Sequence, residues 1–193
     1  KFVKSLDLMS HRGPDHTGLI EHNDIKILFN RLSIIDLSVS ANQPFKYKNY
    51  IIIFNGEIYN HLNLRKNLKQ YVCKTLSDTE TFLALYIEFG NAAIEMIDGM
   101  FAFIIHDIAN DKLIAGRDRL GKKPIYLYKK NRQLFIASEL NVLSNSLPAL
   151  TINEHAIASF LRAGFFSQEL TPYHNVEEIL PGHIYEVNIS SLK

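Results

Sequence analysis

The run Tyr50-Ile51-Ile52-Ile53 constrains the fold of this chain more than any other segment. A short apolar run rich in β-branched residues is typical of a strand buried on both faces. Phe54, Asn55 and Gly56 follow, and glycine tolerates backbone angles that other residues avoid, so we expect the strand to end at Phe54. This end places a side-chain amide, a glycine N–H and the Glu57 carboxylate together. An ordinary turn between a strand and a helix is the alternative.

Hydrophobic periodicity and turn residues predict strands and helices that come in blocks. We expect helices over residues 2–10, 58–68, 77–90, 139–144 and 153–163. We expect strands over residues 25–29, 32–35, 50–54, 100–106, 112–116, 124–128, 133–137 and 184–189. Because strands and helices do not alternate strictly, the pattern favours an α+β fold, with stacked sheets and helices outside, over a doubly wound parallel sheet.

Composition narrows the class of protein. The chain has 193 residues, of which 47% are apolar and 21% charged, as expected for one globular domain with a buried core. The net charge of +1 comes from scattered acidic and basic residues, without the basic stripe of a nucleic-acid-binding protein. The apolar runs are too short to cross a membrane, and no signal peptide is visible. We therefore expect neither a nucleic acid nor a membrane as a partner.

The cysteine and histidine content carries two further expectations. The single cysteine, Cys73, excludes an internal disulfide framework and favours a reducing, cytoplasmic environment. None of the eight histidines has a partner at the spacing of a metal site, and the sequence predicts no metal. His11, His16 and His22 fall in a polar stretch that we expect to be a solvated loop.

Arg31 interrupts an apolar stretch that runs from Phe29 to Ile35. A guanidinium group in such surroundings must extend to solvent or meet an anion, because burying an unpaired charge is costly. Its planar fork suits a two-point contact with a carboxylate. Arg31 is therefore a candidate for binding a substrate carboxylate, and a salt bridge to the nearby Asp36 is the alternative.

Four more residues complete a candidate site for a small amino acid. The Asn55 amide and the Gly56 N–H can donate hydrogen bonds to a developing oxyanion. Glu57 and Asp78 can accept hydrogen bonds from an α-ammonium group, so an arginine opposed by acids would match a zwitterion. Asp78 also lies in a segment, residues 77–80, with the pattern of a helix start, and a capping role is the alternative.

Two other charged segments are interpreted as structural. Arg117-Asp118-Arg119, followed by Gly121, lacks the run of glycines and the helix start of a phosphate site, so we expect a salt-bridged turn. His11-Arg12-Gly13-Pro14-Asp15 is interpreted as a packed loop near the pocket.

Six motifs in a fixed order carry a resemblance to a known family. They are His11-Arg12-Gly13-Pro14-Asp15, Arg31-Leu32-Ser33-Ile34-Ile35-Asp36, Phe54-Asn55-Gly56-Glu57-Ile58-Tyr59-Asn60, Ser77-Asp78-Thr79-Glu80, Gly99-Met100-Phe101-Ala102-Phe103 and Arg117-Asp118-Arg119-Leu120-Gly121. Together they resemble the N-terminal glutamine amidotransferase domain of glutamine-hydrolysing asparagine synthetases. The resemblance runs from about residue 9 to residue 185. Other class II amidotransferases resemble the chain less closely.

The resemblance implies an N-terminal nucleophile hydrolase-like fold, a four-layer αββα sandwich of two stacked antiparallel sheets, with residues 1–193 as one domain. It also implies glutamine as the ligand. Carried over by position, Arg31 would bind the α-carboxylate, with Asp78 and Glu57 at the α-amino group. The Asn55 side chain and the Gly56 N–H would form the oxyanion hole. The pocket would also be lined by the backbone of Leu32, Ser33, Ile34 and Ile35.

The chain departs from the family pattern at the nucleophile. Family members begin with a cysteine whose thiol attacks the glutamine amide and whose free α-amino group serves as base. This chain begins with Lys1-Phe2, and Cys73 is interpreted as a buried structural thiol on a strand. We expect a preceding segment that carries the cysteine. A homologue without a nucleophile, which senses glutamine or docks a synthetase, is the alternative.

The resemblance also implies partners outside these residues. A synthetase needs a C-terminal ATP-pyrophosphatase domain, and its phosphate-loop motif is absent from the sequence. ATP and Mg²⁺ would bind in that domain, where ammonia would convert activated aspartate to asparagine, and no cofactor is expected in the glutaminase domain. An acceptor other than aspartate is the alternative. The oligomeric state stays open, a homodimer included.

Overall fold

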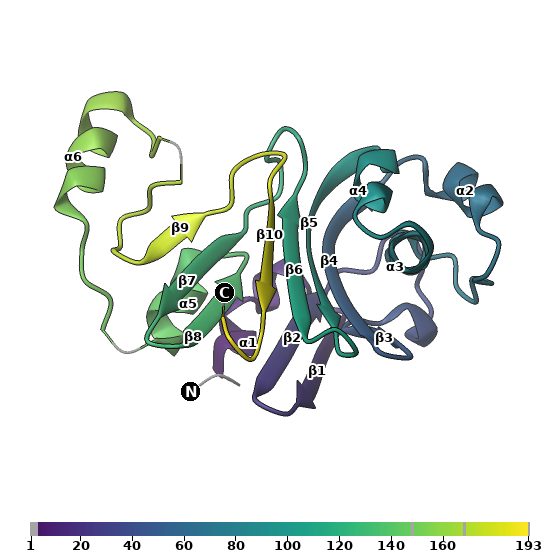
Figure 1. Ribbon diagram of the computed structural model, residues 1–193. Helices are drawn as coiled ribbons and strands as arrows, with labels where there is room; N and C mark the ends of the chain where they lie inside the picture. Colours follow the sequence, from purple (N-terminus) through teal and green to yellow (C-terminus); the bar gives the residue numbers. More distant parts are fainter. Residues whose placement is uncertain (1–3, 148, 168, 193) are drawn as a thin grey trace.

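The computed structural model describes residues 4–147, 149–167 and 169–192, whose strands form three antiparallel sheets (Figure 1). The largest sheet has the strand order β10-β6-β5-β4-β3. Its strands are β3 (Phe45–Tyr47), β4 (Tyr50–Ile58), β5 (Gly99–Asp107), β6 (Lys112–Arg117) and β10 (Ile184–Asn188). The two smaller sheets are the hairpin of β1 (His16–His22) and β2 (Ile25–Arg31), and a sheet ordered β8 (Gln133–Ala137), β7 (Tyr126–Lys130), β9 (Val176–Glu178).

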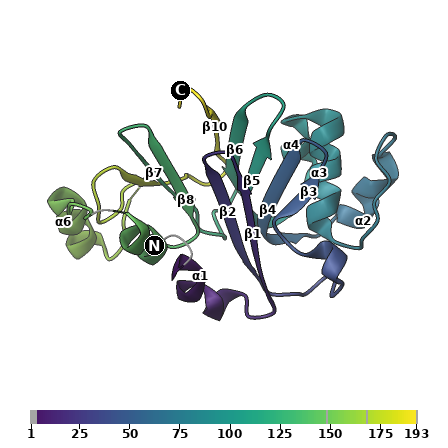
Figure 2. The same cartoon turned by 90° about the horizontal axis from the view of Figure 1, so that it is seen from below.

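Helices lie outside the sheets (Figures 1 and 2). On the outer face of the five-stranded sheet lie α2 (His61–Leu64), α3 (Asp78–Phe89) and α4 (Ala92–Met96). On the far side of the smaller sheets lie α1 (Lys4–Leu8) and α5 (Leu140–Ser146), and α6 (Glu154–Ala163) stands at that end of the molecule. The described residues also form three 3₁₀ helices: η1 (Ser10–Arg12), η2 (Val39–Ala41) and η3 (Arg65–Asn67).

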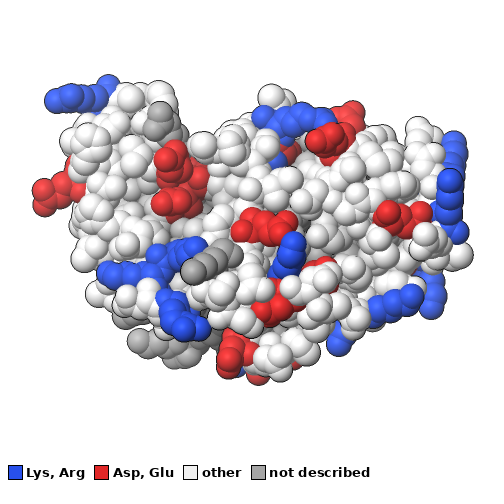
Figure 3. Space-filling view, viewed as in Figure 1, with Lys and Arg blue, Asp and Glu red and all other residues white. Residues whose placement is uncertain are grey.

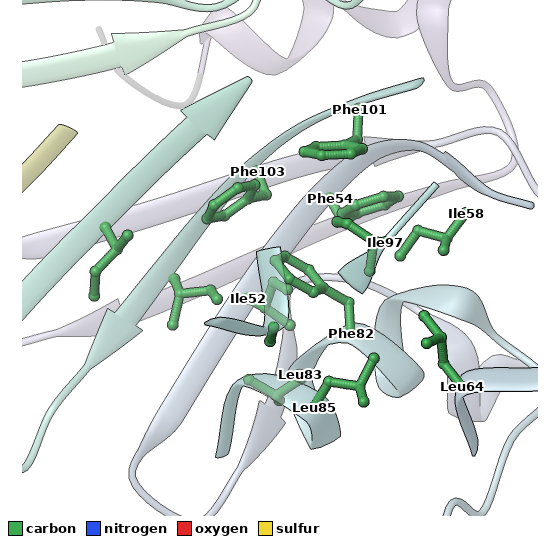
Figure 4. Close-up of a cluster of buried hydrophobic side chains, with 13 residues drawn as sticks. Ile52, Phe54, Ile58, Leu64, Phe82, Leu83, Leu85, Ile97, Phe101 and Phe103 are labelled. Atoms are coloured by element: carbon green, nitrogen blue, oxygen red, sulfur yellow. The ribbon is translucent and has the colours of Figure 1, made fainter. Parts of the chain in front are cut away.

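The layers follow from the alternation of side chains along β5. Phe101 and Phe103 point to one face of the sheet, where they pack with Phe82 of α3 in a buried aromatic cluster (Figure 4). Ala102 and Ile104 point to the opposite face and pack against the β8-β7-β9 sheet. Since successive strand residues face opposite ways, one apolar strand supplies two cores.

A third core separates the β8-β7-β9 sheet from its helix. Leu127 belongs to the core between the sheets, whereas Tyr128 packs with Leu143 and Leu147 on the α5 side. The order of layers is therefore helix, sheet, sheet, helix, and the predicted αββα sandwich with stacked antiparallel sheets is confirmed. None of the helices in the described ranges has both the length and the apolar character of a membrane span.

Several predicted elements have the expected boundaries. Ser77 caps α3 by accepting a hydrogen bond from the Thr79 N–H, and the helix ends at Gly90, whose φ is +58°. Asn153 caps α6 in the same way. The predicted hairpin of residues 124–137 forms, with Lys130 opposite Gln133. These are the segments in which apolar periodicity and cap residues agree.

The predicted end of the central strand at Phe54 is wrong. β4 continues to Ile58, and Gly56 pairs with Phe101 of β5. A Cβ atom at Gly56 would lie 2.0 Å from the Met100 carbonyl oxygen. The glycine is therefore needed for the close approach of two strands and does not mark a turn.

Other predictions fail where local sequence is ambiguous. Residues 32–35 form a loop instead of a strand, and the predicted helix over 58–68 is reduced to α2 and η3. His16 and His22, expected in a loop, are the end residues of β1. Cys73 does not lie on a strand. The short strands β3 and β9 were not expected.

The two charged segments interpreted as structural, at residues 11–15 and 117–121, both form ion pairs with distant parts of the chain. Arg117 forms an ion pair with Glu178 at 2.7 Å, and the buried Asp118 carboxylate accepts hydrogen bonds from backbone N–H groups of its own turn. Arg12 pairs with Glu139, and a Cβ atom at Gly13 would lie 2.2 Å from the Asn30 carbonyl oxygen, so these two residues are packed, whereas His11, Pro14 and Asp15 are exposed. Acidic and basic side chains are both scattered over the face seen in Figure 3.

Candidate functional site

A cavity of about 1150 Å³ lies between the five-stranded sheet and the smaller sheets, lined by residues of β2, β4, β5 and β8. It brings together all but one of the predicted site residues: Arg31, Leu32, Ile34, Ile35, Asn55, Gly56, Glu57 and Asp78. Ser33 is the exception. It lines a smaller neighbouring pocket, and its N–H donates to the Asp15 carboxylate at 2.7 Å.

β4 presents its residues to the cavity in alternation. Phe54 and Ile58 belong to the buried aromatic and aliphatic cluster on the helix side of the sheet. Asn55 and Glu57 therefore project from the opposite face, into the cavity that they line. The Glu57 side chain has no hydrogen-bond partner within the described ranges, which leaves both carboxylate oxygens available.

The backbone groups of β4 alternate as well. The Phe54 N–H donates to the side chain of Gln43, and the Ile58 N–H donates to Asp78, both away from β5. The Tyr59 N–H instead donates to the Asp98 carbonyl on the β5 side. By this alternation the Gly56 N–H points to the same edge as those of Phe54 and Ile58, between them.

Arg31 is the last residue of β2 and is only 6% exposed. Its Nη1 donates to the Ser38 carbonyl at 3.2 Å and to Asn42 Oδ1 at 2.8 Å, and its Nη2 donates to the Asp36 carbonyl. All these acceptors are neutral, and within the described residues Arg31 has no ion pair. The guanidinium is thus held in place by neutral acceptors and not by a direct ion pair.

The expected alternative, a salt bridge between Arg31 and Asp36, is not formed. The Asp36 carboxylate accepts hydrogen bonds from the N–H groups of Ser38 at 2.8 Å and Leu76 at 2.7 Å. Burial by itself would raise the pKa of Asp36, but these hydrogen bonds and the charge of Arg31 outweigh it, and the pKa is lowered. Asp36 therefore stays ionised and ties the loop after β2 to the segment before α3.

Asp78 is the first residue of α3 and is 5% exposed. One carboxylate oxygen accepts from the Ile58 N–H at 2.9 Å and the other from the Thr79 N–H at 2.9 Å. Ser77 is the cap residue, and Asp78 shares with it the Thr79 N–H of the first turn. Burial raises the pKa of Asp78 above its ordinary value, although these hydrogen bonds oppose the shift. A nearby cation would stabilise the ionised form of this buried carboxylate.

Comparison with known proteins identifies the family. A family model described as a glutamine amidotransferase domain matches residues 1–193. The chain belongs to this glutamine amidotransferase family. It is 35% identical over 192 residues to asparagine synthetase [glutamine-hydrolyzing] 1 of Bacillus subtilis (strain 168), a match that covers 97% of this chain and 30% of that protein. It is 39% identical over 158 residues to asparagine synthetase B of Escherichia coli (strain K12), covering 80% of this chain and 28% of that protein.

Solved structures support the amidotransferase fold. Glutamine phosphoribosylpyrophosphate amidotransferase from B. subtilis, solved with ADP and GMP, aligns with a TM-score of 0.59 and 20% identity, covering 86% of this chain and 33% of that one. An allosteric regulatory enzyme of purine biosynthesis aligns with a TM-score of 0.57 and 18% identity. These similarities establish the fold alone. The chain spans about a third or less of the length of the synthetases that it matches.

Cys73 lies outside the candidate site. It does not line the cavity, and burial raises the pKa of its half-buried thiol, which disfavours the thiolate. The prediction of a buried thiol on a strand is wrong, because Cys73 is only partly buried and lies in the loop before α3.

Two residues close to the site were not found from the sequence. Gln43, 7% exposed, hydrogen-bonds both backbone groups of Phe54, and His61, 8% exposed, lies close to Asp78. Burial lowers the pKa of His61, an effect that Asp78 opposes, and the buried His61 Nδ1 has no hydrogen-bond partner among the residues that the structure describes. Gln43 precedes Pro44 in what reads locally as a loop, and its partners are far along the chain, so no local signal marks it.

Proposed function

We propose that this domain binds L-glutamine in the cavity and hydrolyses its side-chain amide. The observation that carries the proposal is the buried guanidinium of Arg31, which forms no direct ion pair within the described residues, in one cavity with the carboxylates of Asp78 and Glu57. An α-carboxylate would neutralise Arg31, and an α-ammonium group would neutralise the acids. The ligand's side chain would then extend along β4 towards Asn55 and Gly56.

The chemistry requires a nucleophile that the described residues do not place in the cavity. We propose a cysteine at the start of a preceding strand, whose free α-amino group, with a pKa of about 7.7–8.0, takes up the thiol proton. The thiolate would attack the amide carbon, and the resulting oxyanion would accept hydrogen bonds from the Asn55 side chain and the Gly56 N–H. Ammonia would leave, and water would hydrolyse the thioester to glutamate.

Two strand edges support the proposed extra strand. β2 and β8 each pair on one side only within the described residues. The cavity is lined by every residue from Ile25 to Leu32 and from Gln133 to Ser138. A strand that met the cavity only through one face would contribute alternate residues, so the continuous lining indicates that both open edges border the space. A strand placed there would join β2 to β8.

The names of the relatives support a proposal for the ammonia acceptor. The synthetases matched here are named as glutamine-hydrolysing asparagine synthetases, and we propose that ammonia is passed to a synthetase domain that amidates aspartate with ATP and Mg²⁺. The described part of this domain contains no cluster of three or more His, Cys, Asp or Glu able to hold a metal ion. The assignment of Mg²⁺ to the synthetase domain rests on the resemblance to these synthetases. A different acceptor is the alternative.

A second candidate function is glutamine sensing without hydrolysis. The observation that favours it is that no cysteine lines the cavity within the described residues. The two functions share Arg31 and Asp78 as ligand contacts, but only hydrolysis needs Asn55 as an oxyanion donor.

The experiment uses the full-length protein with its natural N-terminus and measures ammonia released from glutamine. Asn55→Ala should lower kcat by about 10²–10³-fold, the effect of losing one oxyanion donor. Ile53→Val, on the same face of β4, is the matched control and should leave kcat nearly unchanged. Glutamine binding in a calorimeter without ammonia release would support sensing instead. An Asn55→Ala rate equal to wild type would refute the oxyanion role, and absence of glutamine binding would refute both functions.

Formation of the amide product identifies the acceptor. Supplying glutamine, ATP, Mg²⁺ and aspartate should give asparagine in proportion to ammonia consumed. Ammonia release without asparagine would contradict aspartate as acceptor while leaving the glutaminase activity standing.

A further inference from the structure

The outer edge of β4 is only partly covered by a neighbouring strand. β3 pairs with β4 at three positions, and the last of them joins Phe45 to Ile52. Beyond Ile52, no described strand continues on that side, so the next backbone groups pointing outward, those of Phe54, need other partners.

The Gln43 side chain supplies both of these partners. Its Oε1 accepts a hydrogen bond from the Phe54 N–H at 2.6 Å, and its Nε2 donates to the Phe54 carbonyl oxygen at 3.1 Å. One primary amide thus reproduces the pair of hydrogen bonds that a neighbouring strand residue would make. Since Gln43 is 7% exposed, water does not compete freely for these groups.

Gln43 also contacts the start of α3, on which Asp78 lies. Its Nε2 donates to Thr79 Oγ1 at 3.2 Å, and Thr79 is next to Asp78, whose carboxylate accepts the Ile58 N–H. The N–H groups of Phe54 and Ile58, on either side of Gly56, therefore both donate hydrogen bonds to side chains. The Gly56 N–H lies between these two fixed points.

We propose that Gln43 is a positioning residue for the oxyanion hole. By fixing the peptide groups of Phe54, it sets the direction of the Asn55 side chain and presents the Gly56 N–H to the cavity. This inference rests on the proposed hydrolysis of glutamine. Donors of an oxyanion hole act through preorganisation, so a shift of about 1 Å at this edge costs rate more than it costs substrate binding.

The variant Gln43→Glu distinguishes a positioning role from a purely structural one, because only the positioning role predicts a kcat that depends on the protonation of the new side chain. An ionised glutamate can accept from the Phe54 N–H but opposes the Phe54 carbonyl oxygen with a second negative oxygen. A protonated glutamate has one O–H donor and one acceptor, which restores both hydrogen bonds. The kcat of Gln43→Glu, divided by that of wild type at each pH, should be reduced about 10- to 100-fold at high pH and recover as the pH falls.

Two further variants separate the possible causes. Gln43→Met keeps the approximate shape without the hydrogen bonds, so its kcat should be low at every pH and its ratio to wild type should not change with pH. Thr79→Val removes only the hydrogen bond to Thr79 and should keep kcat within about threefold of wild type. The KM for glutamine should change little in each variant, because Arg31 is untouched.

All rates are measured on the full-length protein and divided by the folded fraction found from unfolding curves. The positioning role would be overturned by a normal kcat in both Gln43 variants. It would also be overturned if a smaller folded fraction explained the whole loss of rate. In either case, ammonia release by the wild-type protein would uphold the proposed function. A pH-independent ratio for Gln43→Glu would also overturn it. If the wild-type protein releases no ammonia, the proposed function fails first and the inference falls with it.

Discussion

The Asp78 carboxylate accepts a hydrogen bond from the Ile58 N–H at 2.9 Å, so the first residue of α3 is fixed to the last residue of β4. The helix layer and the central strand are thereby joined at the rim of the cavity. The carboxylate assigned to the substrate ammonium also holds the strand that carries the assigned oxyanion donors. In the proposed function, substrate binding and the geometry of the oxyanion hole would therefore depend on one buried side chain.

Asp78→Asn should separate binding from stability. The neutral side chain can still accept from the Ile58 N–H, and Ser77 still accepts from the Thr79 N–H, so the free energy of unfolding at pH 7 should stay within about 1 kcal/mol of wild type. Glutamine affinity should fall about 10- to 100-fold with the loss of a charged acceptor. Calorimetry and urea unfolding measure the two effects, and Asp98→Asn, an exposed change, is the control. Unchanged affinity would contradict the ammonium assignment.

The difference in unfolding free energy between wild type and Asp78→Asn should depend on pH, because the pKa of Asp78 is raised. The folded state binds a proton on Asp78 more readily than the unfolded state does, so ionisation costs stability above the raised pKa. As the pH falls from above the raised pKa towards the ordinary value of 3.8, wild type should gain stability relative to Asp78→Asn. Below 3.8 the difference should be constant. Urea unfolding at several pH values would contradict this if wild type lost stability relative to the variant across that window.

Arg31→Lys should weaken both the loop and the site. Lysine keeps the charge but loses the planar fork, and some of the carbonyl and amide oxygens now bound by Arg31 would lose their donor. We expect unfolding to be easier by about 1–3 kcal/mol, and glutamine affinity to fall at least about 10-fold. Arg132→Lys, at an exposed position that also lines the cavity, is the control. Equal glutamine affinity in Arg31→Lys and wild type would contradict the carboxylate assignment.

Gly56→Ala tests the close approach of β4 and β5. The added methyl group would lie 2.0 Å from the Met100 carbonyl oxygen, so the two strands must separate. We expect a loss of about 3 kcal/mol in unfolding free energy. Gly164→Ala is the control, because its φ of +79° is strained for alanine but open space surrounds it, and it should cost only about 1–2 kcal/mol. Similar losses in both variants would show that packing against β5 is unimportant.

Glu80→Gln should loosen the segment between η3 and α3. The Glu80 carboxylate, 1% exposed, accepts hydrogen bonds from the Tyr71 hydroxyl and from the N–H groups of Lys74 and Thr75. An amide would place donors where acceptors are needed, and we expect a loss of about 2–3 kcal/mol. Chemical unfolding measures it, with the exposed change Glu95→Gln as control. A loss equal to that of the control would contradict this account.

Some of the fold is legible in local sequence. α3 could be predicted because Ser77 and Gly90 mark its ends, and the β7–β8 hairpin because two apolar runs flank a polar turn. The Asn55-Gly56 pair was misread because a glycine required by a neighbouring strand looks the same in sequence as one required by a turn. Leu32, Ile34 and Ile35 are apolar but line the cavity, and periodicity cannot distinguish such a segment from a core strand.

The site was predictable in its residue types but not in its connections. Arg31, Asn55, Glu57 and Asp78 could be proposed because charged and amide side chains next to apolar runs need an explanation. Their common cavity depends on strand pairing between distant segments. Gln43 stayed invisible because its partners, 11 and 36 residues away along the chain, are backbone and hydroxyl groups without a sequence signature.

The open edges of β2 and β8 have a practical consequence for handling this domain. Unsatisfied N–H and C=O groups along a strand invite pairing with strands of other molecules. Solutions of these residues by themselves should therefore self-associate as concentration rises, as light scattering would reveal. Short extended peptides that pair with these two edges would block this association, and they would be starting points for inhibitors that exclude the proposed cysteine-bearing strand instead of competing with the substrate.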